Sequence, residues 1–182
     1  MAEVDAKPAV CTSATIRRDR STGHYYVSLD TWGFAKGNDA NNLFIVWLYQ
    51  RFSDETIHLS FKSSAGDFMR PAAFNTIANA IGNCPATVIA YVDHGLTGIE
   101  SYITLEANKI VMRDFGMIQL SPITTEDNSS DLPAPLRAVA DYFFNILDRA
   151  VSRGWVLPEE RDRVLAGYWV NLNPFDLATR LM

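Results

Sequence analysis

Hydrophobic and polar residues alternate with two different periods along the central part of this chain. Residues 56–61 (Thr-Ile-His-Leu-Ser-Phe) and 86–92 (Ala-Thr-Val-Ile-Ala-Tyr-Val) alternate with the period of a strand. A helix is predicted between them, because four apolar residues recur at i, i+3, i+4 and i+7: Phe74, Ile77, Ala78 and Ile81. A small-residue turn at residues 93–98 then opens a second helix. The pattern therefore predicts two successive strand–loop–helix units.

The same patterns predict further elements on both sides of this pair. Before it, residues 24–30 alternate as a strand, and residues 43–49 are apolar on every side, which predicts a helix buried between layers. After it, two short strands are predicted at residues 109–112 and 115–120. This mixture of strands and helices predicts an α/β layered fold.

The two ends of the chain differ in pattern. Residues 1–15 show no periodicity and are predicted to be a flexible N-terminal arm, which leaves residues 16–182 as a single domain. A long amphipathic helix is predicted from Leu136 to Val151, ended at Gly154, and shorter helices are predicted from Leu157 and from Asn173. The C-terminal part is therefore predicted to be a helical segment.

Composition and charge exclude several classes of function. A net charge of −5 and a pI near 5.1 argue against a duplex nucleic-acid surface, and we expect no nucleic-acid partner. The polar N-terminus has no signal-peptide core, and the longest apolar run is too short to cross a bilayer, so we expect a cytoplasmic protein without a membrane partner. Cys11 and Cys84 lie far apart, which predicts neither a disulfide framework nor a zinc site. We expect no cofactor.

The loops of the two strand–helix units are candidates for binding an anion or an oxyanion. Each loop joins a strand end to a helix start, where backbone N–H groups are free and the helix dipole is positive. The first loop is Ser63–Gly66 and the second is Asp93–Gly98. Two such loops side by side can stabilise negative charge on a ligand.

The order of these elements, from Tyr25 to Met182, resembles the crotonase-like superfamily. Within it, the chain is most similar to the proteolytic subunit of the Clp protease and to the signal-peptide-peptidase group. The resemblance implies an α/β, crotonase-like (Clp-protease-like) spiral of strand-strand-helix units with a C-terminal helical segment. It also implies a homo-oligomer, because the family buries flat apolar faces between subunits.

The resemblance assigns roles to residues of this chain. Oxyanion-hole candidates are Ala65 and Gly66 in the first loop, together with Gly98; here the family's proline and first glycine are replaced by Ser64 and Ala65. The nucleophile position matches Thr97, and the histidine position matches Gln119 in Met117–Pro122. The region that supplies the family's aspartate, residues 166–169, carries no acid here. A threonine, a glutamine and no acid do not form a working triad.

Alternatives stay open at several of these positions. Thr97 is either a nucleophile or a helix N-cap, which is a place that threonine prefers. His94, beside Asp93, is either an alternative base for Thr97 or Ser101, or a solvated loop residue. A thioester enzyme can instead use carboxylates as general acid or base. The carboxylates nearest the second loop are Glu100, Glu106 and Asp114. The remaining histidines are interpreted as ordinary strand residues, and they are His24 and His58.

Three functional hypotheses follow. The first is a non-catalytic Clp-peptidase-like homologue that self-assembles and has a structural or regulatory role, with a protein or peptide as a further partner. The second is a divergent serine/threonine-type peptidase or hydrolase that uses Thr97. The third is a crotonase-type enzyme acting on an acyl thioester. An aromatic group at Trp155, Tyr168 and Trp169 is interpreted either as a core edge or as an oligomer contact.

Overall fold

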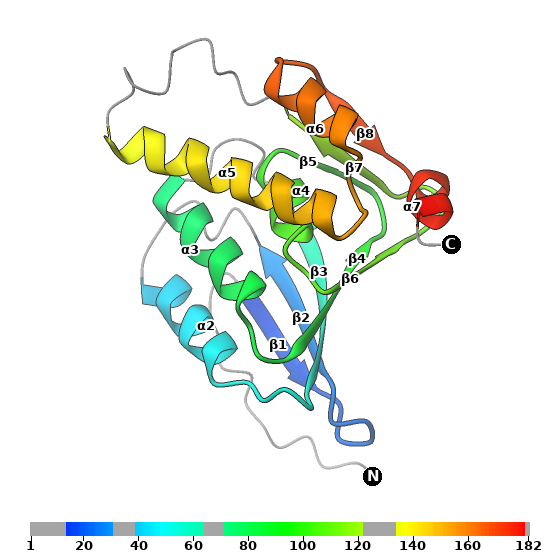
Figure 1. The fold of residues 1–182 in the computed structure, drawn as a ribbon. Helices are drawn as coiled ribbons and strands as arrows, with labels where there is room; N and C mark the ends of the chain where they lie inside the picture. Colours follow the sequence, from blue (N-terminus) through cyan, green and yellow to red (C-terminus); the bar gives the residue numbers. More distant parts are fainter. Residues whose placement is uncertain (1–13, 31–38, 64–70, 122–133, 181–182) are drawn as a thin grey trace.

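The computed structural model describes residues 14–30, 39–63, 71–121 and 134–180. Within these ranges the chain forms two sheets, which six helices accompany (Figure 1). Sheet A has five strands, in the order β1 (Ala14–Arg18), β2 (Tyr25–Asp30), β3 (Thr56–Ser63), β4 (Thr87–Val92) and β6 (Lys109–Met112). Sheet B has three strands, in the order β5 (Gly95–Thr97), β7 (Met117–Leu120) and β8 (Val170–Leu172). The helices are α2 (Asp39–Tyr49), α3 (Pro71–Gly82), α4 (Ile99–Thr104), α5 (Ala134–Ser152), α6 (Pro158–Leu165) and α7 (Pro174–Arg180).

The chain passes between the two sheets in a repeated order. Strand β4 lies in sheet A, β5 in sheet B, and α4 follows; β6 then returns to sheet A and β7 to sheet B. The strands β2, β3, β4 and β6 are parallel, and β1 is antiparallel at the edge. Neighbouring parallel strands need such long crossover connections, and here β5 and α4 supply one of them. The mixed α/β class predicted from the sequence is confirmed.

One face of sheet A forms the core, and the other face is polar. Along β2, Val27 and Leu29 are buried and alternate with Tyr26 and Ser28 on the opposite face. The same alternation continues in β4, where the inward residues are buried. Because side chains alternate along a strand, every outward residue of these strands lies on one common face. On β2 and β3 that face carries mainly polar side chains.

Most predicted elements are confirmed. The strands expected at residues 24–30, 56–61, 86–92 and 109–112 are β2, β3, β4 and β6. The long C-terminal helix is α5, and the chain turns after it at Gly154, whose φ of 75° favours glycine. Helix α6 begins at Pro158, a good first helical residue, as expected.

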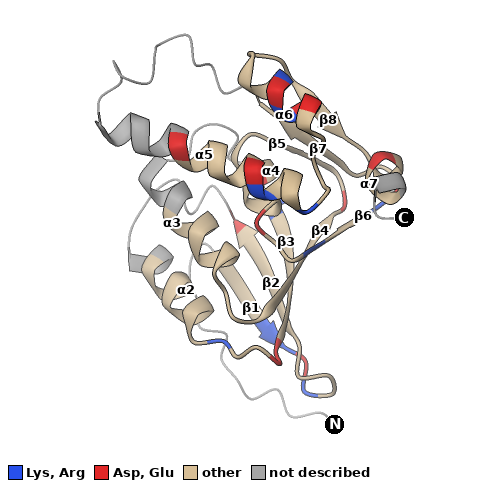
Figure 2. Ribbon diagram, in the orientation of Figure 1, with Lys and Arg blue, Asp and Glu red and all other residues tan. Residues whose placement is uncertain are grey.

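The structure differs from two sequence expectations. Strand β1 begins at Ala14, which is buried, so two residues of the predicted arm belong to sheet A; residues 1–13 lie outside the described residues. The prediction that residues 43–49 form a helix buried on every side is wrong. Leu43, Val46 and Tyr49 of α2 are 64%, 51% and 48% exposed. Helix α2 is covered on one face only, and the residues of α2 whose side chains the structure describes, 42–49, include no charged residue (Figure 2).

The helix that is buried on every side is instead α4. All six of its residues are buried, although three of them are polar. The Ser101 hydroxyl donates to the carbonyl oxygen of Leu96 at 3.0 Å, and the Thr104 hydroxyl donates to that of Glu100 at 2.8 Å. Buried polar groups need such partners to avoid a large desolvation cost. Local composition did not indicate this burial, because α4 is no more apolar than α2.

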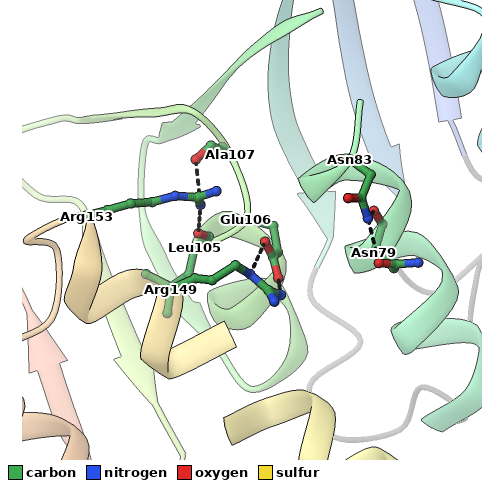
Figure 3. A network of polar contacts seen from close by, with 7 residues as sticks. All are labelled: Asn79, Asn83, Leu105, Glu106, Ala107, Arg149 and Arg153. Carbon is green, nitrogen blue, oxygen red and sulfur yellow. Dashed lines mark hydrogen bonds and ion pairs between the residues drawn. The ribbon is translucent and has the colours of Figure 1, made fainter. Parts of the chain in front are cut away.

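Two arginines hold the end of α4, and they are Arg149 in the last turn of α5 and Arg153 just after that helix (Figure 3). Arg149 forms an ion pair with Glu106, which is 1% exposed, and Arg153 donates to the carbonyl oxygens of Leu105 (2.8 Å) and Ala107 (3.3 Å). Burial lowers the pKa of Arg149, but the hydrogen bond to Glu106 and its charge outweigh burial, so that the pKa is raised. A Cβ at Gly82 would lie 2.6 Å from Glu106 Oε2, so α3 also packs tightly against this carboxylate.

We expect Arg149→Met to lower the free energy of unfolding by about 2–3 kcal/mol, because it leaves the buried Glu106 carboxylate without its cation. This value lies toward the low end of the range for buried ion pairs, since the Arg149 side chain is 43% exposed. Urea denaturation followed by circular dichroism measures the change. The matched control is Arg161→Met, whose exposed pair with Asp148 should contribute less than about 1 kcal/mol. Equal losses in the two variants would contradict the role of the buried pair.

Candidate functional site

Thr97 and Gln119 lie side by side on sheet B. Thr97 is the last residue of β5, and the parallel register pairs it with Gln119 of β7. Their strand neighbours Leu96 and Ile118 are buried in the core, so Thr97 and Gln119 lie on the outward face of the sheet. The resemblance predicted a nucleophile position and a histidine position, and these are the two positions that the register brings together.

Thr97 is not the cap of the following helix. Gly98 is the N-cap of α4, with φ 59° and no side-chain capping bond. Positive φ at this point is costly for a residue with a Cβ, which explains why glycine stands here. The interpretation of Thr97 as an N-cap is therefore wrong, and the threonine hydroxyl belongs to the strand end.

Asn171 is the third member of this row. The antiparallel pairing of β7 with β8 sets Asn171 opposite Gln119, and Gln119 Nε2 donates to Asn171 Oδ1 at 3.1 Å. Sequence reasoning looked for a third residue at 166–169, two positions too early, and missed Asn171. A three-residue strand leaves almost no periodic signal, so only the pairing of β8 reveals it. The row Thr97, Gln119 and Asn171 offers one hydroxyl and two amides.

His94 lies exposed in the loop between β4 and β5. Its neighbour Asp93 pairs with Arg113 Nε at 2.7 Å rather than forming an acid–imidazole pair with His94. Ser101, one suggested partner of His94, is buried and donates to Leu96 instead. The role of His94 as an alternative base for Thr97 stays a prediction.

The first of the two predicted loops cannot be compared with the second. Ala65 and Gly66 lie outside the described residues, and so does most of Ser63–Gly66. Strands β3 and β4, which lead into the two loops, are parallel neighbours in sheet A. Parallel neighbours end at the same edge of a sheet, so a site made of both loops stays a prediction that the topology permits.

The three acids near the second loop have different surroundings. Glu106 is buried and paired with Arg149, and Asp114 is exposed in the turn before β7. Glu100 is fully buried in the first turn of α4, three residues after Thr97. Glu100 is therefore the acid that combines burial with closeness to the Thr97 row.

A second polar cluster lies on the outward face of sheet A, and sequence reasoning missed it. His58 Nδ1 is 2.8 Å from the Tyr91 hydroxyl, and His58 Nε2 is 2.9 Å from His24 Nδ1. The Tyr26 ring stacks on the His58 ring with centroids 4.6 Å apart. Burial, followed by the charge of His24, lowers the pKa of His58. The sequence interpretation treated His24 and His58 as ordinary residues within strands and did not indicate their contact. His58 lies in β3 and His24 directly precedes β2, so the parallel pairing of β2 and β3 joins residues 34 positions apart.

Known proteins were compared with the chain by sequence and by structure. No model of a known protein family matches the sequence, and no curated protein matches it. Solved structures do match. A proposed enoyl-CoA hydratase from Streptomyces coelicolor A3(2) has a TM-score of 0.62 at 14% identity, covering 98% of this chain and 68% of that one. An enoyl-CoA hydratase/isomerase from Marinobacter aquaeolei has a TM-score of 0.58 at 10% identity, over 93% of this chain and 68% of that one. An enoyl-CoA hydratase from Bacillus anthracis has a TM-score of 0.57 at 9% identity, over 92% and 67%.

The fold is crotonase-like. Identities this low establish the fold alone, and this chain spans about two thirds of the length of these three proteins. These structures support the crotonase part of the sequence resemblance. They do not support its Clp-protease part, which remains a hypothesis.

Two further observations concern the described residues only. Among them, no three His, Cys, Asp or Glu residues lie close enough together to hold a metal ion. Within the same ranges, no helix has the length and hydropathy needed to cross a lipid bilayer.

The lowered pKa of His58 predicts how stability depends on pH. Below its ordinary value of 6.5, and down to the lowered value, the unfolded chain binds more protons than the folded chain. The free energy of unfolding therefore rises with pH in this range. Urea denaturation between about pH 5 and about pH 7 should show a shallower rise in His58→Gln than in the unchanged protein. The exposed His94→Gln serves as control. An unchanged slope in His58→Gln would contradict the prediction.

Proposed function

We propose that this chain is a crotonase-type protein that acts on an acyl thioester. The observation that carries the proposal is the buried carboxylate of Glu100, three residues after Thr97 in the chain, in a fold shared with enoyl-CoA hydratases. A reaction of this kind needs a group that polarises the thioester carbonyl and a group that moves a proton on the acyl chain. It needs no nucleophile and no triad.

Each requirement has a candidate in this chain. The backbone N–H groups where α4 begins, at Gly98, are the candidates for holding the carbonyl oxygen. Glu100 is the candidate general acid or base. Because Glu100 is closed to solvent, it takes part only after an acyl chain has entered beside α4, and proton transfer is then shielded from water. Glu106 is excluded from this role, because its charge is already balanced by Arg149.

Crotonyl-CoA is the probe that tests this function. We expect the protein to bind it in a calorimetric titration and to consume its conjugated double bond, followed by ultraviolet absorbance. Glu100→Gln should lower kcat by about 100-fold or more, the usual contribution of a general acid or base. The control is Asp114→Asn, which removes an exposed acid of the same region. If the unchanged protein neither binds crotonyl-CoA nor consumes it, the proposal is overturned.

A second candidate function rests on the hydrogen bond between Gln119 and Asn171. A glutamine amide does not accept a proton from threonine, so this row supports a Clp-peptidase-like homologue without hydrolytic activity. Such a protein would act by assembly. The half-exposed Trp169, together with exposed Tyr168 and Phe175, offers apolar surface for contacts between copies. Self-association stays a prediction, and sedimentation at micromolar concentration measures it.

We expect casein and small peptide esters to be hydrolysed no faster than in buffer, because no base faces Thr97 in the row Thr97, Gln119 and Asn171. A fluorophosphonate should likewise leave the intact mass unchanged. The triple change Thr97→Ser, Gln119→His and Asn171→Asp supplies the missing groups and serves as a positive comparison. Turnover by the unchanged protein that Thr97→Ala abolishes would instead favour a divergent hydrolase using Thr97.

A further inference from the structure

The outward face of sheet A carries a groove that the proposed function does not use. Its floor follows from the strand register. Thr15 of β1 pairs with Ser28 of β2, and Ser28 pairs with Ser60 of β3. Three small hydroxyl side chains thus stand in one row across three strands. The groove above them has a volume of about 340 Å³, toward the small end of ligand pockets.

Larger side chains form the walls of the groove. Two residues away along each strand, the register aligns a second row, which consists of Arg17, Tyr26 and His58. The Tyr91 ring closes the far end, where its hydroxyl contacts His58 Nδ1 at 2.8 Å. Successive outward residues of one strand lie about 7 Å apart, so a flat ring fits between a wall and the next row. The groove is therefore shaped for a flat molecule that lies across the strands.

His58 lines the groove and can carry a positive charge there, although both of its ring nitrogens already have partners. Its two ring nitrogens contact Tyr91 and His24. When both rings are neutral, the two hydrogen bonds form together only if both donors point in the same direction along the series Tyr91, His58 and His24. The two facing nitrogens of His24 and His58 share one proton and cannot both carry one. A proton taken up by His58 adds one positive charge beside the groove.

The charge around the groove differs from that of the whole chain, which is −5. Two arginines, Arg17 and Arg113, line the groove, and the acid among its lining residues is Asp93, which pairs with Arg113. Lys62 reaches over to Thr15, with its Nζ donating to Oγ1 at 2.9 Å. Figure 2 shows the basic residues of β1 in blue, and these are Arg17 and Arg18. A locally positive groove in an acidic protein attracts small anions.

We propose that this groove binds a small aromatic carboxylate, whose ring lies over the Ser28–Ser60 floor and whose carboxylate lies between Arg17 and His58. Arg17 is the cation best suited to the carboxylate, because Arg113 already pairs with Asp93. The hydroxyl groups of Thr15 and Ser60 can donate to the ligand or accept from it. Binding in this groove does not require catalysis at the Thr97 row. This inference is therefore independent of the proposed function.

Binding and protonation of His58 must favour each other. A bound carboxylate stabilises the imidazolium, and by linkage the imidazolium strengthens binding to the same extent. The charged or titratable groups that face His58 are His24, Tyr26, Tyr91, Arg17, Lys109, Asp93 and Arg113. The one carboxylate among them, Asp93, is held by Arg113. The dependence of binding on pH therefore reports His58.

Benzoate is the probe, titrated into the full chain and followed by amide and imidazole NMR shifts. We expect shifts at Ser28, Ser60 and His58, with a dissociation constant about tenfold lower at about pH 5.5 than at about pH 7.5. Arg17→Gln should weaken binding about tenfold. Its matched control is Arg18→Gln, the next residue of β1, which faces the other way over the Tyr25 ring. His58→Gln should abolish the pH dependence.

Several outcomes would overturn the inference. They are shifts confined to residues near Thr97, equal binding of inorganic phosphate and benzoate, equal effects of Arg17→Gln and Arg18→Gln, or no saturable shift at all. Arg17 is exposed, so Arg17→Gln is expected to fold even if His58→Gln does not. The test therefore does not depend on whether His58→Gln folds.

Discussion

The ion pair between Glu106 and Arg149 is the constraint on which the rest of this structure depends. It joins the end of the buried helix α4 to the last turns of α5, and Arg153 strengthens the same contact through two carbonyl oxygens. A buried carboxylate without a cation would cost several kcal/mol, so α5 can pack only where Arg149 reaches Glu106. The tight approach of α3 at Gly82 leaves little freedom for that carboxylate to move.

The burial of α4 has a consequence for the candidate site. With all six residues enclosed, α4 cannot shift against β5 without breaking the hydrogen bond from Ser101 to the carbonyl oxygen of Leu96. Its first residues are therefore held firmly beside β5, and Gly98 with its positive φ makes the sharp entry possible. Rigid placement of polar groups is what binding and catalytic sites require. The same enclosure keeps Glu100 dry, which distinguishes it from the solvated acid Asp114.

Both polar sites of the described chain arise from strand register on an outward sheet face. On sheet B, pairing aligns Thr97, Gln119 and Asn171, whose positions span 75 residues of sequence. On sheet A, pairing of β2 with β3 brings His24 to His58, and β4 adds Tyr91. Parallel sheets are commonly covered on both faces, yet the outward face of sheet A carries hydroxyl, imidazole and guanidinium groups. Such side chains suit contact with small polar molecules better than contact with an apolar layer.

The sequence by itself determined the elements and the fold class. Periodicity located β2, β3, β4 and β6, and the stop at Gly154 located the end of α5, because these signals are local. Tertiary structure alone decided which faces are covered. Residues 43–49 are more apolar than α4, yet only α4 lies between neighbours on every side. It also decided which polar residues meet, as with His24 and His58 or Gln119 and Asn171. Register is set by packing over the whole sheet, and no local pattern records it.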